Sequence, residues 1–342
     1  MRKANERKYI GHLSQVERIE EHILKGGKGD GMRLLEVNNG NGLEFTVSLD
    51  RCADISRLSF KGVNFGYFTP CGYVAPSYYD AEGFGFLKSF TAGFMTTCGF
   101  NNVGGPCEVD GEKLPQHGTI SNTPAENVSY WTDDKGQHII ADIRQAQLFG
   151  NQYLLRRKID CPKGENYIDI TDTIVNESAR PAPVMLLYHC NIGYPLLTEN
   201  AEMYIPSVKC EPSGEWAAQN VDTWNKILAP QEGFEEQCYF HKIKDENGKS
   251  FGAIFNPEEE MGVAIEFDTN ELDCLTEWKM MGEIEYVMGI EPGNSYPIGR
   301  ARAKEDNTLK MLMPGEEKTV KLRVRIIENE EQAKEYKSKI SQ

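Results

Sequence analysis

The chain has 342 residues, with 37 basic and 52 acidic side chains and a formal net charge of −15 at pH 7. A surface this acidic is expected to bind neither nucleic acid nor membranes, because both are bound chiefly through Lys and Arg patches. No apolar run reaches the roughly 18 residues that a membrane-spanning helix needs. The first 24 residues lack the apolar core of a secretory signal, so we expect a cytoplasmic protein.

Nine cysteines are scattered along the chain, and their pattern bears on compartment and on metal binding. Their number is odd, no CxxC pair occurs, and the chain is far longer than a small disulfide scaffold. Free thiols in a reducing cytoplasm are therefore expected. Without CxxC pairs or a HExxH helix, the sequence gives no support to a structural or peptidase-type zinc site.

Helical patterns are expected near the two ends of the chain. Residues 14–17, read SQVE, resemble a capping box, and Val16, Ile19 and Ile23 recur at helical spacing. The sequence therefore predicts a short helix over residues 14–24. The tail predicts a polar helix over residues 329–340.

Strand patterns dominate between these ends. Apolar and polar residues alternate over residues 43–49, 168–175, 263–268 and 320–326. A period of two is typical of antiparallel sheets with one solvated face, and the glycines and prolines between these runs mark turns. With no repeat and no convincing linker, the sequence predicts a single domain over residues 1–342, of the all-β class, built as one large antiparallel β-sandwich.

Residues 62–124 differ from the rest because they are rich in aromatic residues and glycine. Long irregular segments in compact domains are usually functional or disordered. The aromatic side chains supply too much apolar surface for disorder, and an aromatic-lined concave surface suits sugar rings. The segment could instead simply cap an edge of the sandwich.

A histidine stands inside the apolar run LLYHCNIGYPLL of residues 186–197. The run is short and bounded by prolines, which favours a buried strand over a helix. Because side chains alternate along a strand, Leu187, His189 and Asn191 share one face. Buried polar groups need partners, and the partner of His189 could be structural or could be a substrate.

Further polar residues stand where strands or turns end. His117 follows a proline turn, Arg51 and Asp54 follow the strand over residues 43–49, and Glu291 ends an apolar run. A carboxylate that ends an apolar strand needs a hydrogen-bond donor or a cavity. Each of the others also has a structural explanation, as a turn-stabilising residue or a surface ion pair.

Taken together, these motifs resemble the aldose 1-epimerase (galactose mutarotase-like) superfamily. They are His117-Gly118, the run His189–Gly193, and Ile290–Pro292, in the family's order. The chain looks most like the branch of aldose-epimerase-like proteins of unknown function. It departs from the usual pattern in having Thr119 where a second glycine is common, and Asn101-Asn102 in place of an Asn-Arg pair. The resemblance implies a galactose mutarotase-like β-supersandwich.

The resemblance also implies an isomerase of carbohydrate metabolism, a mutarotase, whose partner is a small-molecule sugar and which needs no cofactor and no metal. Glu291 would be the base that removes the anomeric hydroxyl proton, and His189 the acid that protonates the ring oxygen. His117 would hydrogen-bond the ring oxygen or a neighbouring hydroxyl. Asn191, on the same face as His189, would orient the substrate or the imidazole.

Four other residues are expected to bind the sugar. Arg51 and Asp54 are expected at the rim of the site, where Arg51 could bind a carboxylate or vicinal hydroxyls, or pair with Asp54. Trp278 and Lys279, in the run TEWKMMGEIEY, are the other two candidates. The protein is expected to be a monomer or a homodimer.

Three other functions stay open at this point. Two histidines and a carboxylate are also a metal-ligand set, as in cupins, and would suit a metal-dependent sugar isomerase. The same fold could serve as a non-catalytic sugar sensor. The same trio could also catalyse lyase or epimerase chemistry at a carbon other than C1.

Overall fold

The computed structural model of this protein describes residues 6–340, so residues 1–5 and 341–342 of the expected domain lie outside the described residues. Strands dominate, and every ladder between two named strands is antiparallel. The prediction of an all-β, antiparallel architecture is confirmed.

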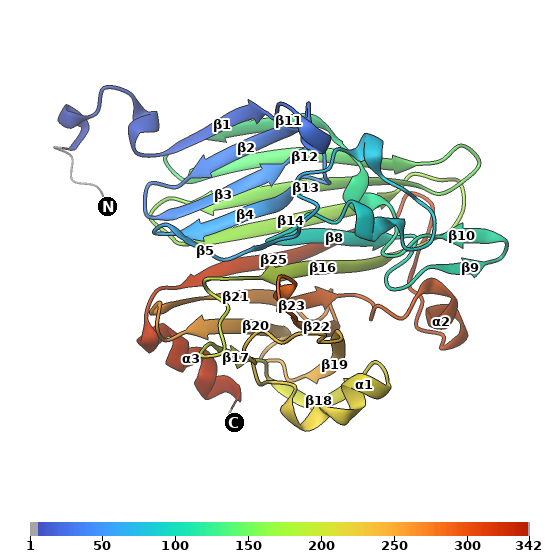
Figure 1. The fold of residues 1–342 in the computed structure, drawn as a ribbon. Helices are drawn as coiled ribbons and strands as arrows, with labels where there is room; N and C mark the ends of the chain where they lie inside the picture. The colour runs from blue at the N-terminus through green and yellow to red at the C-terminus, as the bar shows by residue number, and fades with distance from the viewer. Residues whose placement is uncertain (1–5, 341–342) are drawn as a thin grey trace.

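Three larger sheets make up most of the fold (Figure 1). The five-stranded sheet runs β1 (Arg18–Ile23), β2 (Arg33–Asn38), β3 (Leu43–Ser48), β4 (Asp54–Phe60) and β5 (Val63–Asn64). The eight-stranded sheet runs β11 (Ala125–Thr132), β12 (Gly136–Ala146), β13 (Gln152–Pro162), β14 (Tyr167–Asn176), β25 (Glu317–Ile327), β21 (Met261–Asp268), β20 (Lys249–Asn256) and β17 (Glu202–Tyr204). The six-stranded sheet runs β18 (Ser207–Pro212), β19 (Gln237–Ile243), β22 (Cys274–Met281), β23 (Tyr286–Gly293), β16 (Met185–Ile192) and β8 (Met95–Phe100).

Short elements connect and cover these sheets. The three two-stranded sheets are β9 (Cys107–Val109) with β10 (Glu112–Leu114), β15 (Ala182–Pro183) with β24 (Met311–Leu312), and β6 (Tyr67–Phe68) with β7 (Ala92–Gly93). The α-helices are α1 (Glu215–Gln219), α2 (Arg300–Glu305) and α3 (Glu330–Ile340). The 3-10 turns are η1 (Glu6–Tyr9), η2 (Leu13–Gln15), η3 (Gly27–Gly29), η4 (Pro76–Tyr78), η5 (Gly85–Lys88), η6 (Ile120–Asn122) and η7 (Val221–Thr223).

The sheets are layered around one large apolar core. Figure 1 shows the five-stranded sheet lying over β11–β14 of the eight-stranded sheet. One contiguous cluster joins Val37 of β2, Ile139 of β12, Tyr188 of β16 and Val324 of β25. The eight-stranded sheet thus serves as one layer, against which the other two large sheets pack. This is the sandwich that period-two alternation predicts.

Burial along the strands explains which sequence patterns are alternating and which are not. In β14 every second residue is buried, as the alternation over residues 168–175 predicts. In β16 all eight residues are buried, because one face packs on the sandwich core and the other lies under residues from the aromatic segment. His189 therefore stands in a strand with no solvated face.

The prediction of a helix over residues 14–24 is wrong. The capping interaction belongs instead to η2, where His12 N donates to Gln15 Oε1 at 3.0 Å. From Arg18 to Ile23 the chain forms β1, which pairs along its full length with β2 at the edge of the five-stranded sheet. Pairing with a preformed edge outweighs the helical spacing of a few apolar residues. The C-terminal helix is confirmed as α3.

The aromatic segment 62–124 is more ordered than a loop. It contains β8, which runs beside β16 in the six-stranded sheet and pairs Thr96 with His189. The remainder forms short strands and 3-10 turns. The segment therefore contributes a strand to the sheet that carries the site.

Two further expectations concern membrane-spanning helices and the cysteines. No helix among residues 6–340 is long and apolar enough to cross a membrane. All nine cysteines lie within the described residues, and each is a free thiol.

Candidate active site

The registers of the six-stranded sheet place His189 and Glu291 side by side. The β16–β23 ladder pairs Leu187 with Gly293 and Cys190 with Ile290, so His189 lies opposite Glu291 on one face. Their closest atoms, His189 Nε2 and Glu291 Oε1, are 3.1 Å apart. Two residues separated by about a hundred positions are thus neighbours because two antiparallel strands pair in this register.

Asn191 determines which nitrogen of His189 carries the proton. The Asn191 amide donates from Nδ2 to the His189 carbonyl at 2.9 Å, which directs its oxygen toward the ring. That oxygen lies 2.6 Å from His189 Nδ1. Because an amide oxygen can only accept, Nδ1 donates, and the neutral imidazole presents the lone pair of Nε2 to Glu291.

His117 comes to the same site from the turn that follows β10. Its backbone adopts a left-handed conformation, with φ of 57°, and its peptide is held by Gly104 and Gly99. Nδ1 accepts a hydrogen bond from Gly104 N at 3.3 Å, which leaves Nε2 as the donor. Its ring stands edge-on to that of His189, with centroids 5.8 Å apart.

Burial disfavours charge at all three groups. It raises the pKa of Glu291 well above its ordinary value, and the nearby carboxylate of Glu236 adds to that shift. It lowers the pKa of His189 to about 3, with the neighbouring His117 as a second cause. It also lowers the pKa of His117 to about 4. Near neutrality both imidazoles are therefore uncharged, and the Glu291 carboxyl keeps its proton to a higher pH than an exposed glutamate does.

Glu291 is not fully satisfied by the protein. Its side chain is 2 % exposed, yet Oε1 has no well-aligned hydrogen-bond partner among the described residues. A buried polar atom without a partner costs about 1–3 kcal/mol. Such costs persist where a ligand supplies the missing partner. Among residues 6–340 no group of three His, Cys, Asp or Glu side chains is arranged to hold a metal ion.

Aromatic side chains enclose the pair. Phe90 and Trp278 each place a ring edge against His189, at centroid distances of 5.3 and 5.1 Å. Phe86 packs on Phe90 and on His117. Phe86 and Phe90 belong to the aromatic segment, whereas Trp278 comes from β22. These rings form an aromatic cluster around His189, and the pair therefore lies in a buried, low-dielectric environment in which charge interactions are strong.

Sequence reasoning placed Asn191 and Trp278 in the site, and the structure brings both into contact with His189. It missed Phe86, Phe90 and Glu236, which accepts a hydrogen bond from Trp278 Nε1 at 2.8 Å. The aromatic richness of residues 62–124 was the signal for the two phenylalanines. An exposed glutamate in an acidic turn gives no comparable signal.

The rim position expected for Arg51 and Asp54 is wrong, because both are buried and are bonded within the protein. Arg51 donates to the carbonyls of Ser121, Val74 and Ser89. Its hydrogen bonds therefore stabilise the turn between β3 and β4 and the aromatic segment.

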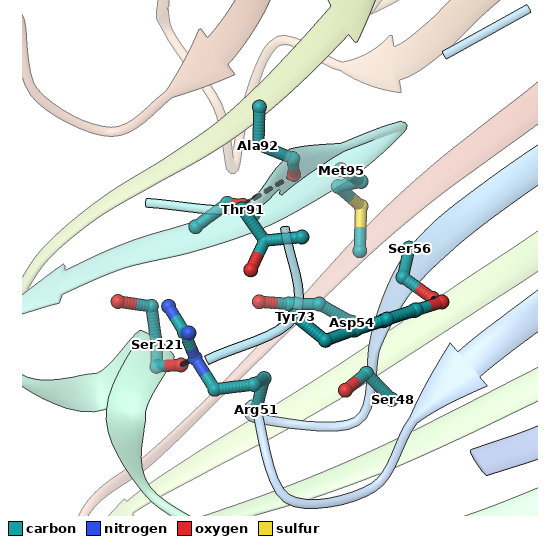
Figure 2. Close-up of a pocket in the computed structure, with 10 residues that line it drawn as sticks. Ser48, Arg51, Asp54, Ser56, Tyr73, Thr91, Ala92, Met95 and Ser121 are labelled. Carbon is teal, nitrogen blue, oxygen red and sulfur yellow. Dashed lines mark hydrogen bonds between the residues drawn. The ribbon is translucent and has the colours of Figure 1, made fainter. Parts of the chain in front are cut away.

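Asp54 pairs with Arg157, not with Arg51. It accepts from Arg157 Nη1 at 2.6 Å and from Thr97 N and Oγ1. Arg157 also binds Asp172 through two nitrogens, all within the core behind β16. Arg51 and Asp54 line a cavity of about 20 Å³, shown in Figure 2, which has room for about one water molecule.

Lys279 is also misplaced by the sequence reasoning. It follows Trp278 directly on β22, so its side chain leaves the opposite face of the sheet. There Nζ donates to the carbonyls of Thr223 and Trp224. Lys279 therefore secures the η7 turn and does not reach the His189 side.

Comparisons with known proteins place this fold and site in context. Residues 29–326 match the family model described as "Domain of unknown function (DUF4432)", a range that contains all the site residues named above. No curated protein matches the sequence.

Solved structures are similar over nearly the whole chain. A Klebsiella pneumoniae protein described as a candidate aldose 1-epimerase is 27% identical, with a TM-score of 0.88 over 94% of this chain and 86% of that one. A galactose mutarotase-like protein from Clostridium acetobutylicum is 16% identical, with a TM-score of 0.67 over 91% of this chain and 99% of that one. A galactose 1-epimerase from Lactobacillus acidophilus is 11% identical, with a TM-score of 0.62 over 92% of this chain and 99% of that one. The expected galactose mutarotase-like fold is confirmed.

Proposed function

The chain belongs to the family described as a domain of unknown function (DUF4432), and we propose that it is an aldose 1-epimerase that interconverts sugar anomers by acid–base ring opening. The observation that carries the proposal is the buried His189–Glu291 pair, with 3.1 Å between Nε2 and Oε1. Oε1 of Glu291 is buried and has no hydrogen-bond partner among the described residues, so a bound sugar hydroxyl could supply one. The structural neighbours add support, because several are described as aldose 1-epimerases or mutarotase-like proteins.

The chemistry needs one proton acceptor and one proton donor at the same anomeric carbon. In the Glu⁻/HisH⁺ form of the pair, Glu291 takes the proton from the C1 hydroxyl while His189 gives a proton to the ring oxygen. The C1–ring oxygen bond breaks, and a carbonyl forms at C1. Rotation about the C1–C2 bond and reversal of both transfers close the ring to the other anomer. Nothing is oxidised or reduced, so the reaction needs no redox cofactor.

The pair is suited to both directions because its proton count does not change. Glu291-H with neutral His189 and ionised Glu291 with protonated His189 differ only in where one proton lies. A sugar bound here has a C1 hydroxyl and a ring oxygen, both bonded to C1. It would therefore bring two polar oxygens close to His189 and Glu291. Those oxygens favour the separated charges over the neutral form, because they replace lost hydration.

The neighbouring residues have distinct expected roles. Asn191 keeps Nδ1 protonated, so Nε2 is the atom that exchanges the proton. His117 presents Nε2–H to the ring oxygen or an adjacent hydroxyl, because its Nδ1 accepts from Gly104 N. Phe90 and Trp278 supply apolar walls for the C–H faces of a sugar, and a mostly apolar pocket with few polar groups is typical of small-molecule sites.

Exchange NMR on a panel of free aldoses tests the proposal, because it detects anomer interconversion directly. We expect the parent to accelerate exchange for at least one sugar, and Glu291→Gln to lose about 10²–10⁴-fold while still binding that sugar. Glu285→Gln, on the exposed tip before β23, is the matched control and should keep the parent rate.

Two results would contradict the proposal. A parent that binds sugars without accelerating exchange is a sensor, not an epimerase. Glu291→Gln turning over at the parent rate would remove Glu291 as the base.

A further inference from the structure

Glu236 lies on the exposed side of the Trp278 indole, and no sequence motif points to it. It directly precedes β19 and is exposed, and its Oε2 accepts a hydrogen bond from Trp278 Nε1 at 2.8 Å. The β19–β22 ladder pairs Cys238 with Trp278, so Glu236, two residues before Cys238, lies toward the same face of the sheet as the indole. Trp278 in turn places its ring 5.1 Å from that of His189. One indole therefore connects an exposed carboxylate to the buried pair.

The groups around Glu291 leave Glu236 as the charge that acts on it. From β16 the carboxyl faces His189, with His117 beyond, and burial keeps both neutral near pH 7. The thiols of Cys98, Cys190 and Cys238 are near enough to sense the charge of Glu291, and burial raises the pKa of each. Those thiols are therefore uncharged as well. Among the described residues Glu236 is the charged group that raises the Glu291 pKa, after burial itself.

We propose that Glu236 is a positioning residue of this site: its hydrogen bond to Nε1 holds the Trp278 indole against His189, and its carboxylate places a negative charge on this side of the His189–Glu291 pair. The importance of Glu236 in turnover rests on the proposed function, because acid–base ring opening needs a proton on the His189–Glu291 pair. The contact and the charge effect are properties of the folded protein alone.

The physical reason is the sign of the interaction. The Glu236 carboxylate repels the ionised form of Glu291 and so adds to the effect of burial. Glu291 therefore retains its proton to a higher pH. Removing that charge should lower the Glu291 pKa toward its ordinary value. The basic side of the pH–rate profile should therefore move when the charge is removed.

Glu236→Gln separates the charge from the hydrogen bond. The glutamine oxygen still accepts from Trp278 Nε1–H, but the negative charge is gone. In protein labelled with ¹³C at the glutamate carboxyls, Glu291→Gln identifies the resonance of Glu291. We expect its titration midpoint to fall in Glu236→Gln and to stay unchanged in Glu235→Gln, the exposed neighbour.

Glu236→Ala removes both contributions and tests the positioning. We expect the Trp278 indole N–H resonance to shift in Glu236→Ala and to stay near its parent position in Glu236→Gln. An unchanged Glu291 midpoint in Glu236→Gln, or an unchanged indole resonance in Glu236→Ala, would overturn the proposal. Both readouts are independent of turnover, so a parent without epimerase activity would refute the proposed function and leave this test intact.

Where turnover is observed, the same variants are compared by their pH–rate profiles. The basic limb should move to lower pH in Glu236→Gln and not in Glu235→Gln. An unmoved limb in Glu236→Gln would also count against the proposal.

Discussion

Glu277 Oε2 lies 3.1 Å from His241 Nε2, and both side chains are fully buried on the face of the six-stranded sheet opposite to Glu291 and His189. The β22–β23 ladder pairs Glu277 with Ile290 and Thr276 with Glu291, so the two carboxyls lie on neighbouring strands and point to opposite sides. Within residues 6–340, His241–Glu277 is thus a second buried carboxyl–imidazole pair beside His189–Glu291. The second is covered by Trp224, whose ring lies 4.7 Å from that of His241.

Glu277→Gln is therefore a test of which pair does the chemistry. Because Glu277 faces away from the aromatic cluster around His189, we expect this variant to keep anomer exchange within a few-fold of the parent. Glu291→Gln should lose about 10²–10⁴-fold, the usual contribution of a general acid or base. Exchange NMR on both folded variants decides between them, and equal losses would mean that the two pairs act as one unit.

Glu291→Gln is also expected to stabilise the protein at neutral pH. Burial raises the Glu291 pKa above its ordinary 4.5, so above that pH the unfolded chain releases a proton that the folded chain retains. Stability is thereby lost as pH rises from 4.5, and the amide does not have this cost. We expect the free energy of unfolding to rise at pH 7, and this gain to shrink as the pH falls below 4.5. Urea unfolding at pH 4 and 7 measures it, and a loss of stability at pH 7 would contradict the reasoning.

The parent pH–rate profile should have its acid limb well below the ordinary histidine pKa. Burial lowers the pKa of His189 to about 3 and that of His117 to about 4. The one-proton form of the pair therefore persists down to about pH 3–4 and gives way at high pH only when Glu291 ionises. Initial rates over a wide pH range test this, on protein shown to stay folded. An acid limb near pH 6.5 would indicate a solvated histidine.

Asn191→Asp should move that acid limb upward. In the parent, the Asn191 side-chain oxygen lies 2.6 Å from His189 Nδ1. The variant keeps an oxygen at this position but gives it a negative charge, which favours the imidazolium. The raised His189 pKa should appear in ¹⁵N spectra of the imidazole. Asn191→Ala is the control for loss of the hydrogen bond alone. A His189 midpoint that is the same in all three proteins would show that Asn191 does not control the ring.

Arg157→Met should strongly destabilise the fold. Arg157 is fully buried and holds both Asp54 and Asp172, so its removal leaves two buried carboxyls without a cation. Breaking such a buried pair costs about 3–5 kcal/mol. Arg156→Met on the same strand breaks an exposed pair with Asp142 and should cost at most about 1 kcal/mol. Denaturant unfolding compares the two, and similar losses would contradict the buried network.

The sequence predicts much of this fold because its strands alternate or are uniformly apolar. It also indicates His189, Asn191 and Glu291, since polar residues in buried strands are visible without a structure. The pairing of β16 with β23 is not visible, because register depends on packing between strands a hundred residues apart. Arg51 and Asp54 were misassigned for the same reason: their partners, Ser121 and Arg157, lie on distant segments.

The helix expected over residues 14–24 failed where local spacing competed with an available sheet edge. Ile19 and Ile23 fit a helix, but β2 offers backbone partners to the whole segment. Phe86 and Phe90 could be expected to line a surface, yet which surface they cover follows from how η5 packs on β8 and β16. Such packing has no period that the sequence displays.

Strand β22 constrains how the chain can change in length. Its alternate residues serve two unrelated purposes. Trp278 packs against His189, while Glu277 and Lys279 bind partners on the opposite face of the sheet. Deleting one residue before Trp278 in this strand would bring Lys279 to its place against His189, and inserting one there would bring Glu277. The exposed turn over residues 283–285 has no such parity, so natural variation in length should gather there, and an alignment gap drawn inside the strand would be misplaced.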